Sequence, residues 1–188
     1  MIIIVEGPDG SGKDTFIENL VKLTGMRHVR GSSFEISQGG PDKMYEKWMN
    51  MLLEEDDIII NRFCYSNLVY GPMYGYPTIT KEQARKINKL VNERAIVYHI
   101  DANTDIIMER IKKRGDDDIS PDEIKDLQAS YNHMWDLMKP RMLVKIDSSD
   151  DNLLDMKSDV YSRVLEYNYV LDEIVNENMR TQNIQKGD

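Results

Sequence analysis

Short apolar runs alternate with segments of helical periodicity along most of the chain. Four runs rich in β-branched residues are typical of strands, at residues 1–5, 57–63, 95–101 and 142–147. The first two runs each contain three consecutive isoleucines. Such an uninterrupted apolar run predicts a strand that is buried on both faces of a parallel sheet. A fifth, shorter strand is expected within residues 28–36.

Helices are expected between these strands, because apolar residues recur there every three or four positions. The expected helices cover residues 13–23, 44–53, 65–73, 80–92, 103–113, 120–138 and 153–179. Ser120, Pro121 and Glu123 form a strong helix-start sequence. Strands that alternate with helices predict right-handed βαβ units. We therefore expect one α/β domain over residues 1–188, with a parallel five-stranded sheet flanked by helices.

Composition limits the classes of partner. The chain has 188 residues, 40% of them hydrophobic and 30% charged, which is typical of a soluble globular domain. A net charge of −9 argues against binding a nucleic acid polymer, so an anionic ligand would need a local cluster of cations. Cys64 is the single cysteine, which favours a reducing, cytoplasmic location. No apolar run approaches the length of a membrane span, so we expect no membrane partner.

The segment 7–15, with the sequence Gly-Pro-Asp-Gly-Ser-Gly-Lys-Asp-Thr, joins the first strand to the first helix. Strand, glycine-rich turn and helix form the context of a phosphate-binding loop, because backbone N–H groups and the helix N-terminus attract a polyphosphate. Lys13 is expected to reach the β- and γ-phosphates. The usual Ser or Thr after the lysine is replaced by Asp14, and a hydroxyl follows at Thr15. A Mg²⁺ ion would lack the direct hydroxyl ligand, take it from Thr15, or be held through water.

Further candidates follow the other strands, because ligands of open α/β sheets bind beyond the carboxyl ends of the strands. Arg62 directly follows an apolar strand, where it could bind the phosphate of an acceptor or form a structural salt bridge. The cations between Arg110 and Arg114 could belong to a mobile lid over about residues 110–121, or could simply complement a helix C-terminus. Aromatic side chains that could stack on a base, or belong to the core, are Tyr45, Trp48, Phe63, Tyr65 and Tyr70.

These motifs together resemble those of thymidylate kinases. The resemblance rests on Glu6–Lys13, on Asn61-Arg62-Phe63 with Ser66 and Tyr70, on Ile100-Asp101, on Arg110 with Arg114-Gly115, and on Ile146-Asp147. It implies a P-loop NTPase fold with a short lid, ATP and Mg²⁺ as cofactors, small-molecule nucleotides as partners, and a homodimer. It also implies that the deoxynucleoside monophosphate dTMP is phosphorylated to dTDP. The compact pattern is similar to that of viral members, whose location would be the host cytoplasm.

The resemblance also implies residue roles. Asp9 would lie near the sugar 3′-hydroxyl and the metal, and Arg62 would bind the acceptor phosphate. Ser11 stands where part of the family has a basic residue, so the lid would supply the catalytic cation. The expected catalytic residues are Lys13, Arg62, Arg114 and Asp9, and the expected metal site is Thr15 with Asp9. The expected ATP-binding residues are Gly7, Asp9, Gly10, Ser11, Gly12, Lys13, Asp14, Thr15 and Arg110. The expected acceptor-binding residues are Asp9, Arg62, Phe63, Ser66, Tyr70, Tyr45 and Trp48.

Three positions depart from the family pattern, and they keep two alternatives open. Asn61 replaces the usual Asp, Gly71 replaces an amide that helps to distinguish thymine, and Ile119 stands where the lid usually has an Arg. One alternative is a deoxynucleoside kinase, which needs a carboxylate base for the 5′-hydroxyl, and Glu35 is the candidate. The other is a nucleotide-binding protein that has lost catalysis, which Asp14 and Asn61 would explain.

Overall fold

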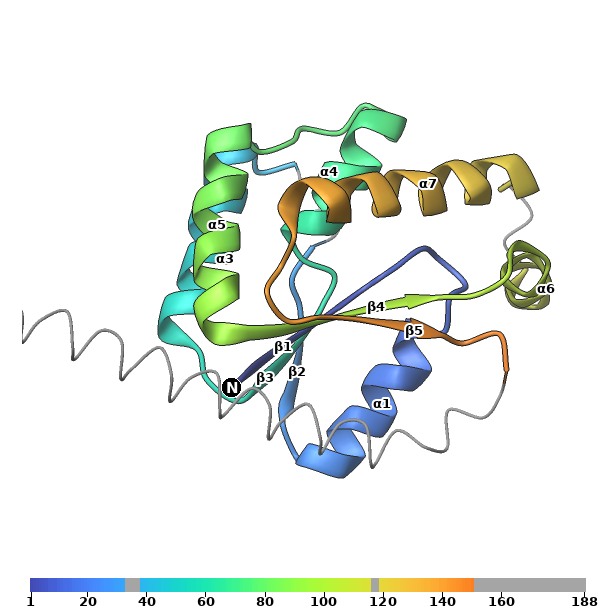
Figure 1. Cartoon of the computed structure of the whole chain (residues 1–188), viewed down its shortest axis with the longest axis horizontal. Coiled ribbons are helices and arrows are strands. Elements are labelled where there is room, and N and C mark those ends of the chain that lie inside the picture. Colours follow the sequence, from blue (N-terminus) through green and yellow to red (C-terminus); the bar gives the residue numbers. More distant parts are fainter. Residues whose placement is uncertain (33–37, 116–118, 151–188) are drawn as a thin grey trace, which may run out of the picture. The chain divides into compact units, whose positions relative to one another are not determined.

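The computed structural model describes residues 1–32, 38–115 and 119–150 (Figure 1). Its sheet has five parallel strands in the order β2-β3-β1-β4-β5. The strands are β1 (Ile2–Glu6), β2 (Arg27–Arg30), β3 (Ile58–Asn61), β4 (Ala95–Asp101) and β5 (Leu143–Asp147). The predicted parallel five-stranded sheet is confirmed. The helix expected over residues 153–179 lies outside the described residues.

The described helices follow the expected ranges with shifts of a few residues at their ends. They are α1 (Lys13–Thr24), α3 (Pro41–Glu54), α4 (Cys64–Tyr74), α5 (Lys81–Arg94), α6 (Thr104–Arg114) and α7 (Pro121–Met138). Helix α3 begins three residues before the first periodic apolar residue, because Pro41 suits the first turn. The Ser120 and Glu123 side chains each accept a hydrogen bond from the other's backbone N–H, which confirms the helix start there. None of the described helices is long and apolar enough to cross a membrane.

Helices cover both faces of the sheet (Figure 1). Successive residues of a strand point to opposite faces. Tyr98 of β4 therefore packs on Phe16 of α1, with ring centroids 5.1 Å apart. Its neighbour His99 packs on Tyr131 and Trp135 of α7, at 5.0 and 5.5 Å. The central strands β1 and β3 are buried throughout, whereas the edge strands β2 and β5 carry exposed residues.

The register of the sheet determines which loops meet. Val5 of β1 pairs with Asn61 of β3, and Glu6 pairs with His99 of β4. Because all five strands are parallel, their carboxyl ends lie at one edge of the sheet. The loops that follow β1 and β3 are therefore neighbours, although more than fifty residues separate them in the sequence.

Candidate active site

The loop between β1 and α1, together with the first residues of α1, is named here the glycine-rich loop and comprises residues 7–15. A Cβ atom on Gly7 would lie 2.0 Å from the carbonyl oxygen of Ile100, so glycine is required where the loop passes the end of β4. Gly12 precedes α1 in the left-handed conformation, with φ 88°. The loop thus packs closely on the sheet edge and leads directly into the N-terminus of α1.

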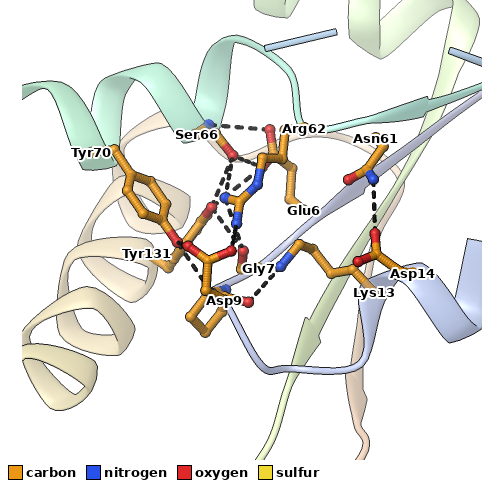
Figure 2. Close-up of polar contacts among 11 residues, drawn as sticks. Glu6, Gly7, Asp9, Lys13, Asp14, Asn61, Arg62, Ser66, Tyr70 and Tyr131 are labelled. Atoms are coloured by element: carbon orange, nitrogen blue, oxygen red, sulfur yellow. Dashed lines mark hydrogen bonds and ion pairs between the residues drawn. The ribbon is translucent and has the colours of Figure 1, made fainter. Parts of the chain in front are cut away.

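Lys13 is the first residue of α1 and is only 6% exposed. Its Nζ atom donates a hydrogen bond to the carbonyl oxygen of Pro8, at 2.5 Å, so the side chain folds back over the loop (Figure 2). Burial and the positive charge of Arg62 lower the pKa of Lys13 to about 7. A buried cation with one neutral partner is costly. An anionic ligand over the loop would offset that cost.

Arg62 follows β3 in a conformation that is rare for residues other than glycine, with φ 60°. Its backbone N–H donates to the carbonyl oxygen of Val5, at 2.9 Å, which ties the start of this loop to β1. The guanidinium donates to Asp9 at 2.5 Å and lies 4.8 Å from the centre of the Tyr70 ring. Figure 2 shows that this side chain reaches over the glycine-rich loop. The structure therefore brings together the predicted residues Asp9, Arg62 and Tyr70.

Asp9 is about half exposed, at 52% of its side chain. Its second carboxylate oxygen accepts a hydrogen bond from the Tyr70 hydroxyl at 3.2 Å. Burial alone would raise the pKa of Asp9, but the nearby Arg62 and Lys13 cations outweigh it and hold that pKa below its ordinary value. Asp9 is thus an ionised partner of Arg62.

Glu6 supports this arrangement, although no role was predicted for it from the sequence. The carboxylate is fully buried at the end of β1 and accepts hydrogen bonds from the backbone N–H groups of Phe63 and Ser66, at 2.8 and 3.1 Å. It also accepts from the Ser66 hydroxyl. Glu6 therefore satisfies the N-terminus of α4 from another element. Its place at the end of a buried apolar strand was the signal available in the sequence.

Arg110 and Ser148 form hydrogen bonds with each other and with the glycine-rich loop. Arg110 donates to the side chain and the backbone oxygen of Ser148, at 2.9 and 2.7 Å. The Ser148 hydroxyl donates to the backbone oxygen of Ser11 at 2.6 Å. The Ser11 side chain is fully buried, so its hydroxyl faces inward rather than toward a ligand. Ser148 was not among the predicted residues, because nothing in the sequence links it to the loop.

Asp14 and Asn61, the two departures noted in the sequence, contact each other. Asn61 Nδ2 donates to Asp14 Oδ1 at 3.0 Å (Figure 2). Asn61 is 9% exposed, and its own Oδ1 atom is buried without a hydrogen-bond partner in the described part of the chain. Carboxylate and amide oxygens are ligands that suit Mg²⁺. This pair therefore offers oxygen atoms that suit a Mg²⁺ ion, and the predicted ligand Thr15 is the next residue of α1.

The residues that were expected to contact the acceptor differ in how deeply they are buried. Trp48, Phe63 and Tyr65 have no exposed surface and form part of the core, so their rings are not open to a base in this structure. Trp48 instead donates a hydrogen bond to the Gly31 carbonyl oxygen at 2.7 Å. Tyr45 is partly buried against the same core. Ser66 is also buried, at 3% exposure, so it acts on this site through Glu6 and Arg62.

Tyr70 begins a stack of tyrosine rings that leads away from Arg62. Its ring lies 5.9 Å from that of Tyr74, which lies 5.9 Å from that of Tyr76. Next to Tyr70, a Cβ atom on Gly71 would meet the Thr78 methyl group at 2.0 Å. A larger side chain has no room there, so this chain cannot place an amide at that position without rearrangement.

The expected lid is described in part. Arg114 is exposed in the last turn of α6, and residues 116–118 lie outside the described residues. Arg110, one helical turn earlier, contacts the glycine-rich loop through Gly10 and Ser148. Glu35, the candidate base of a nucleoside kinase, also lies outside the described residues.

A separate polar cavity of about 420 Å³ lies at the ends of β4 and β5, and no residue of the glycine-rich loop lines it. Its lining includes His99, Asp101, Gln128, Asn132, Lys145 and Asp147. The described residues contain no group of three or more His, Cys, Asp or Glu side chains that could enclose a metal ion.

Comparison with known proteins relates the chain to YorR of Bacillus subtilis. No protein-family model matches the sequence. The sequence is 36% identical over 134 residues to the SPbeta prophage-derived uncharacterized protein YorR. The aligned residues cover 71% of this chain and 81% of YorR. The crystal structure of YorR in complex with phosphorylated GDP has a TM-score of 0.76 and 29% identity to this chain, covering 90% of this chain and 98% of YorR.

Two solved kinases share the fold. Thymidylate kinase from Candida albicans has a TM-score of 0.58 and 15% identity, covering 90% of this chain and 92% of that enzyme. Shikimate kinase from Acinetobacter baumannii has a TM-score of 0.54 and 12% identity, covering 88% of this chain and 93% of that enzyme. At these identities the similarity concerns the fold. The chain therefore has the fold of the P-loop kinases and belongs to the same protein family as YorR.

Proposed function

We propose that this protein is a nucleoside monophosphate kinase that transfers the γ-phosphoryl group of ATP to a deoxynucleoside monophosphate. The observation that carries the proposal is the arrangement of two cations from different elements, one buried and one largely buried. Lys13 comes from the glycine-rich loop and Arg62 from the end of β3, and both side chains lie over this loop. Two phosphate groups, one from a donor and one from an acceptor, would match two cations that approach from different sides.

The reaction needs positioning and charge neutralisation rather than a base. The bond between the γ-phosphorus and the oxygen that bridges it to the β-phosphate breaks, and a bond forms to an oxygen of the acceptor phosphate. That acceptor oxygen is already anionic, so no proton has to be removed. Lys13 and the loop amides would hold the donor, and Arg62 would exchange Asp9 for the acceptor phosphate. Asn61 is an amide and cannot act as a base.

Mg²⁺ would enter the site with the nucleotide. When bound, it neutralises negative charge on the β- and γ-phosphate oxygens. Asp14 and Asn61 offer the oxygen atoms that suit it, as described above. Both carboxylate oxygens of Asp9 already have partners in Arg62 and Tyr70, so we assign Asp9 to the acceptor side instead.

The identity of the acceptor base has two candidates. The thymidylate kinase resemblance favours dTMP. A guanine nucleotide is the second candidate, because the crystal structure of the relative YorR contains phosphorylated GDP. The lack of space at Gly71 weakens the case for dTMP, because an amide that could distinguish thymine is absent there. We further propose a homodimer in the cytoplasm, and sedimentation analysis would test the dimer.

Release of ADP, measured with dTMP, dGMP, thymidine or no acceptor, tests this function. We expect a monophosphate to be phosphorylated far better than thymidine. Arg62→Ala should raise the KM for that monophosphate by roughly 10-fold or more, taking a charge-assisted pair as worth about 1.5–3 kcal/mol. Arg85→Ala removes an exposed arginine of α5 and should change nothing. A preference for thymidine would indicate a nucleoside kinase, and no ADP with any acceptor would indicate a protein that only binds nucleotides.

A further inference from the structure

The contact between Asp14 and Asn61 reverses a familiar distribution of charge. In P-loop NTPases a neutral Ser or Thr of the loop and an Asp from another strand hold the Mg²⁺ ion. In this chain the loop carries the carboxylate, at Asp14, and the end of β3 carries the neutral side chain, at Asn61. Relative to the common pattern, either Asp14 or Asn61 alone would change the net charge of the pair. The two differences together leave that charge unchanged.

We propose that Asp14 is the protein ligand of the nucleotide-bound Mg²⁺ and that Asn61 holds its carboxylate in position. The proposal rests on the proposed function, because the ion would arrive with a nucleoside triphosphate. Asn61 Nδ2 donates to one carboxylate oxygen of Asp14 at 3.0 Å. The Asp14 side chain is exposed, so its second oxygen remains accessible.

A second observation at Asn61 supports a polar ligand here. This residue is 9% exposed, and its Oδ1 atom is buried without a partner among the described residues. A buried acceptor without a donor costs about 1–3 kcal/mol. The fixed Nδ2 contact to Asp14 determines which way the amide is turned, so Oδ1 cannot satisfy itself by rotation. A Mg²⁺ ion, or a water bound to it, would satisfy this oxygen.

The alternative ligand Thr15 fits less well. Successive residues of a helix point about 100° apart around its axis. Asp14 already faces Asn61, so Thr15 faces another direction. The presence of Asp14 also explains why residue 61 is a neutral amide. An aspartate at position 61 would place two carboxylates in contact.

Moving the carboxylate from position 14 to position 61 tests the proposal. Four proteins are compared: the wild type, Asp14→Ser, Asn61→Asp and the double variant that carries both changes. The measured quantity is the Kd for ATP without acceptor, determined by calorimetry with Mg²⁺ and with EDTA. The ratio of the two Kd values gives the contribution of Mg²⁺ to nucleotide binding, independently of turnover.

We expect Asp14→Ser to reduce this Mg²⁺ contribution by roughly 10-fold or more, in the range of metal-site substitutions. The double variant should recover it to within about 3-fold, because it restores one carboxylate and one hydroxyl. Asn61→Asp alone should lower the Tm in EDTA, and Mg²⁺ should raise that Tm again, since the ion would separate two like charges. Asp105→Ser removes an exposed acidic residue from the first turn of α6 and should match the wild type.

The outcomes separate the two claims. If Asp14→Ser keeps the Mg²⁺ contribution of the wild type, or if the double variant is no better than Asp14→Ser, Asp14 is not the ligand and the kinase proposal remains. If the wild type binds no ATP under either condition, the proposed function is wrong and the metal proposal is wrong with it. Melting curves of all four proteins without nucleotide show whether any variant fails to fold. For a variant that does, Asp14→Asn, which keeps the shape of the side chain, replaces Asp14→Ser in the comparison.

Discussion

His99 is a buried imidazole whose charge state affects stability. It is 2% exposed, lies against the rings of Tyr131 and Trp135, and has a buried Nε2 atom without a partner among the described residues. Burial and the positive charges of Lys145 and Lys13 lower the pKa of His99 to about 3. In the unfolded chain its pKa is the ordinary value of about 6.5. The unfolded state therefore binds an additional proton between these values, and stability falls as the pH falls below 6.5.

Replacing His99 with phenylalanine should remove this pH dependence. Between pH 7 and pH 5 the free energy of unfolding of the wild type should fall by about 2 kcal/mol more than that of His99→Phe. Urea titrations at both pH values measure the difference. His133→Phe is the matched control, because His133 is exposed on α7. Equal losses in His99→Phe and the wild type would show that His99 is protonated in the folded protein.

At the level of single residues, local sequence context identified the cations but not their supports. Lys13 follows a glycine-rich turn and Arg62 follows an apolar strand, and both contexts are visible within a few residues. Glu6 had one local signal, its place at the end of an apolar strand, but its partners lie more than fifty positions away. Ser148 also acts on a distant residue, Ser11, and has no local signal. The rings of Trp48 and Phe63 had two interpretations, and packing between α3 and the sheet places both in the core.

At the scale of elements, the central strands and the capped helices could be predicted, because their signals are local. The isoleucine runs of β1 and β3 and the capping sequence at Ser120 each depend on adjacent residues. The start of α4 at Cys64 lies one residue from the expected start at residue 65, but its capping group could not be predicted, since it is the Glu6 carboxylate of β1. The strand order also depends on contacts between distant segments.

Helix α6 carries two arginines that should behave differently. Arg110 is bound to Ser148 and the glycine-rich loop, whereas Arg114 is exposed one turn later. If α6 leads into a lid that closes over the phosphates, the Arg114 contact forms mainly in the transition state. Arg114→Ala should then lower kcat roughly 10-fold or more while the Kd for ATP changes little. Steady-state kinetics and calorimetry measure the two effects separately.

Two comparisons make the lid prediction specific. Lys113→Ala removes a neighbouring exposed cation of the same turn and should have a small effect. Arg110→Ala should lower the Tm as well as the activity, because it removes hydrogen bonds that are present without ligand. An Arg114→Ala protein with normal kcat would assign the cations of this turn to the helix C-terminus, where positive charge is favourable in any case.

At the scale of the whole molecule, the sheet order creates the site. Strands β1 and β3 are neighbours, so the glycine-rich loop and Arg62 meet although they are distant in the sequence. The net charge of −9 disfavours the approach of an anionic nucleotide to the protein as a whole. Attraction must therefore come from the cations at this edge of the sheet. The fold thus places Lys13 and Arg62 at the edge of the sheet where the N-terminus of α1 also favours anions.

If donor and acceptor phosphates occupy one continuous site, a compound that joins adenosine and thymidine, or adenosine and deoxyguanosine, through a chain of phosphates should bind more tightly than ATP. Linking makes the second contact intramolecular, so we expect the Kd of the better compound to be at least about 10-fold lower than that of ATP. Lys13→Ala should weaken both ligands, because both contain the donor phosphates. Arg62→Ala should weaken the linked compound by roughly 10-fold and leave ATP nearly unchanged. Calorimetry with each ligand and variant measures this pattern. Equal weakening of ATP and the linked compound by Arg62→Ala would instead place Arg62 on the donor side.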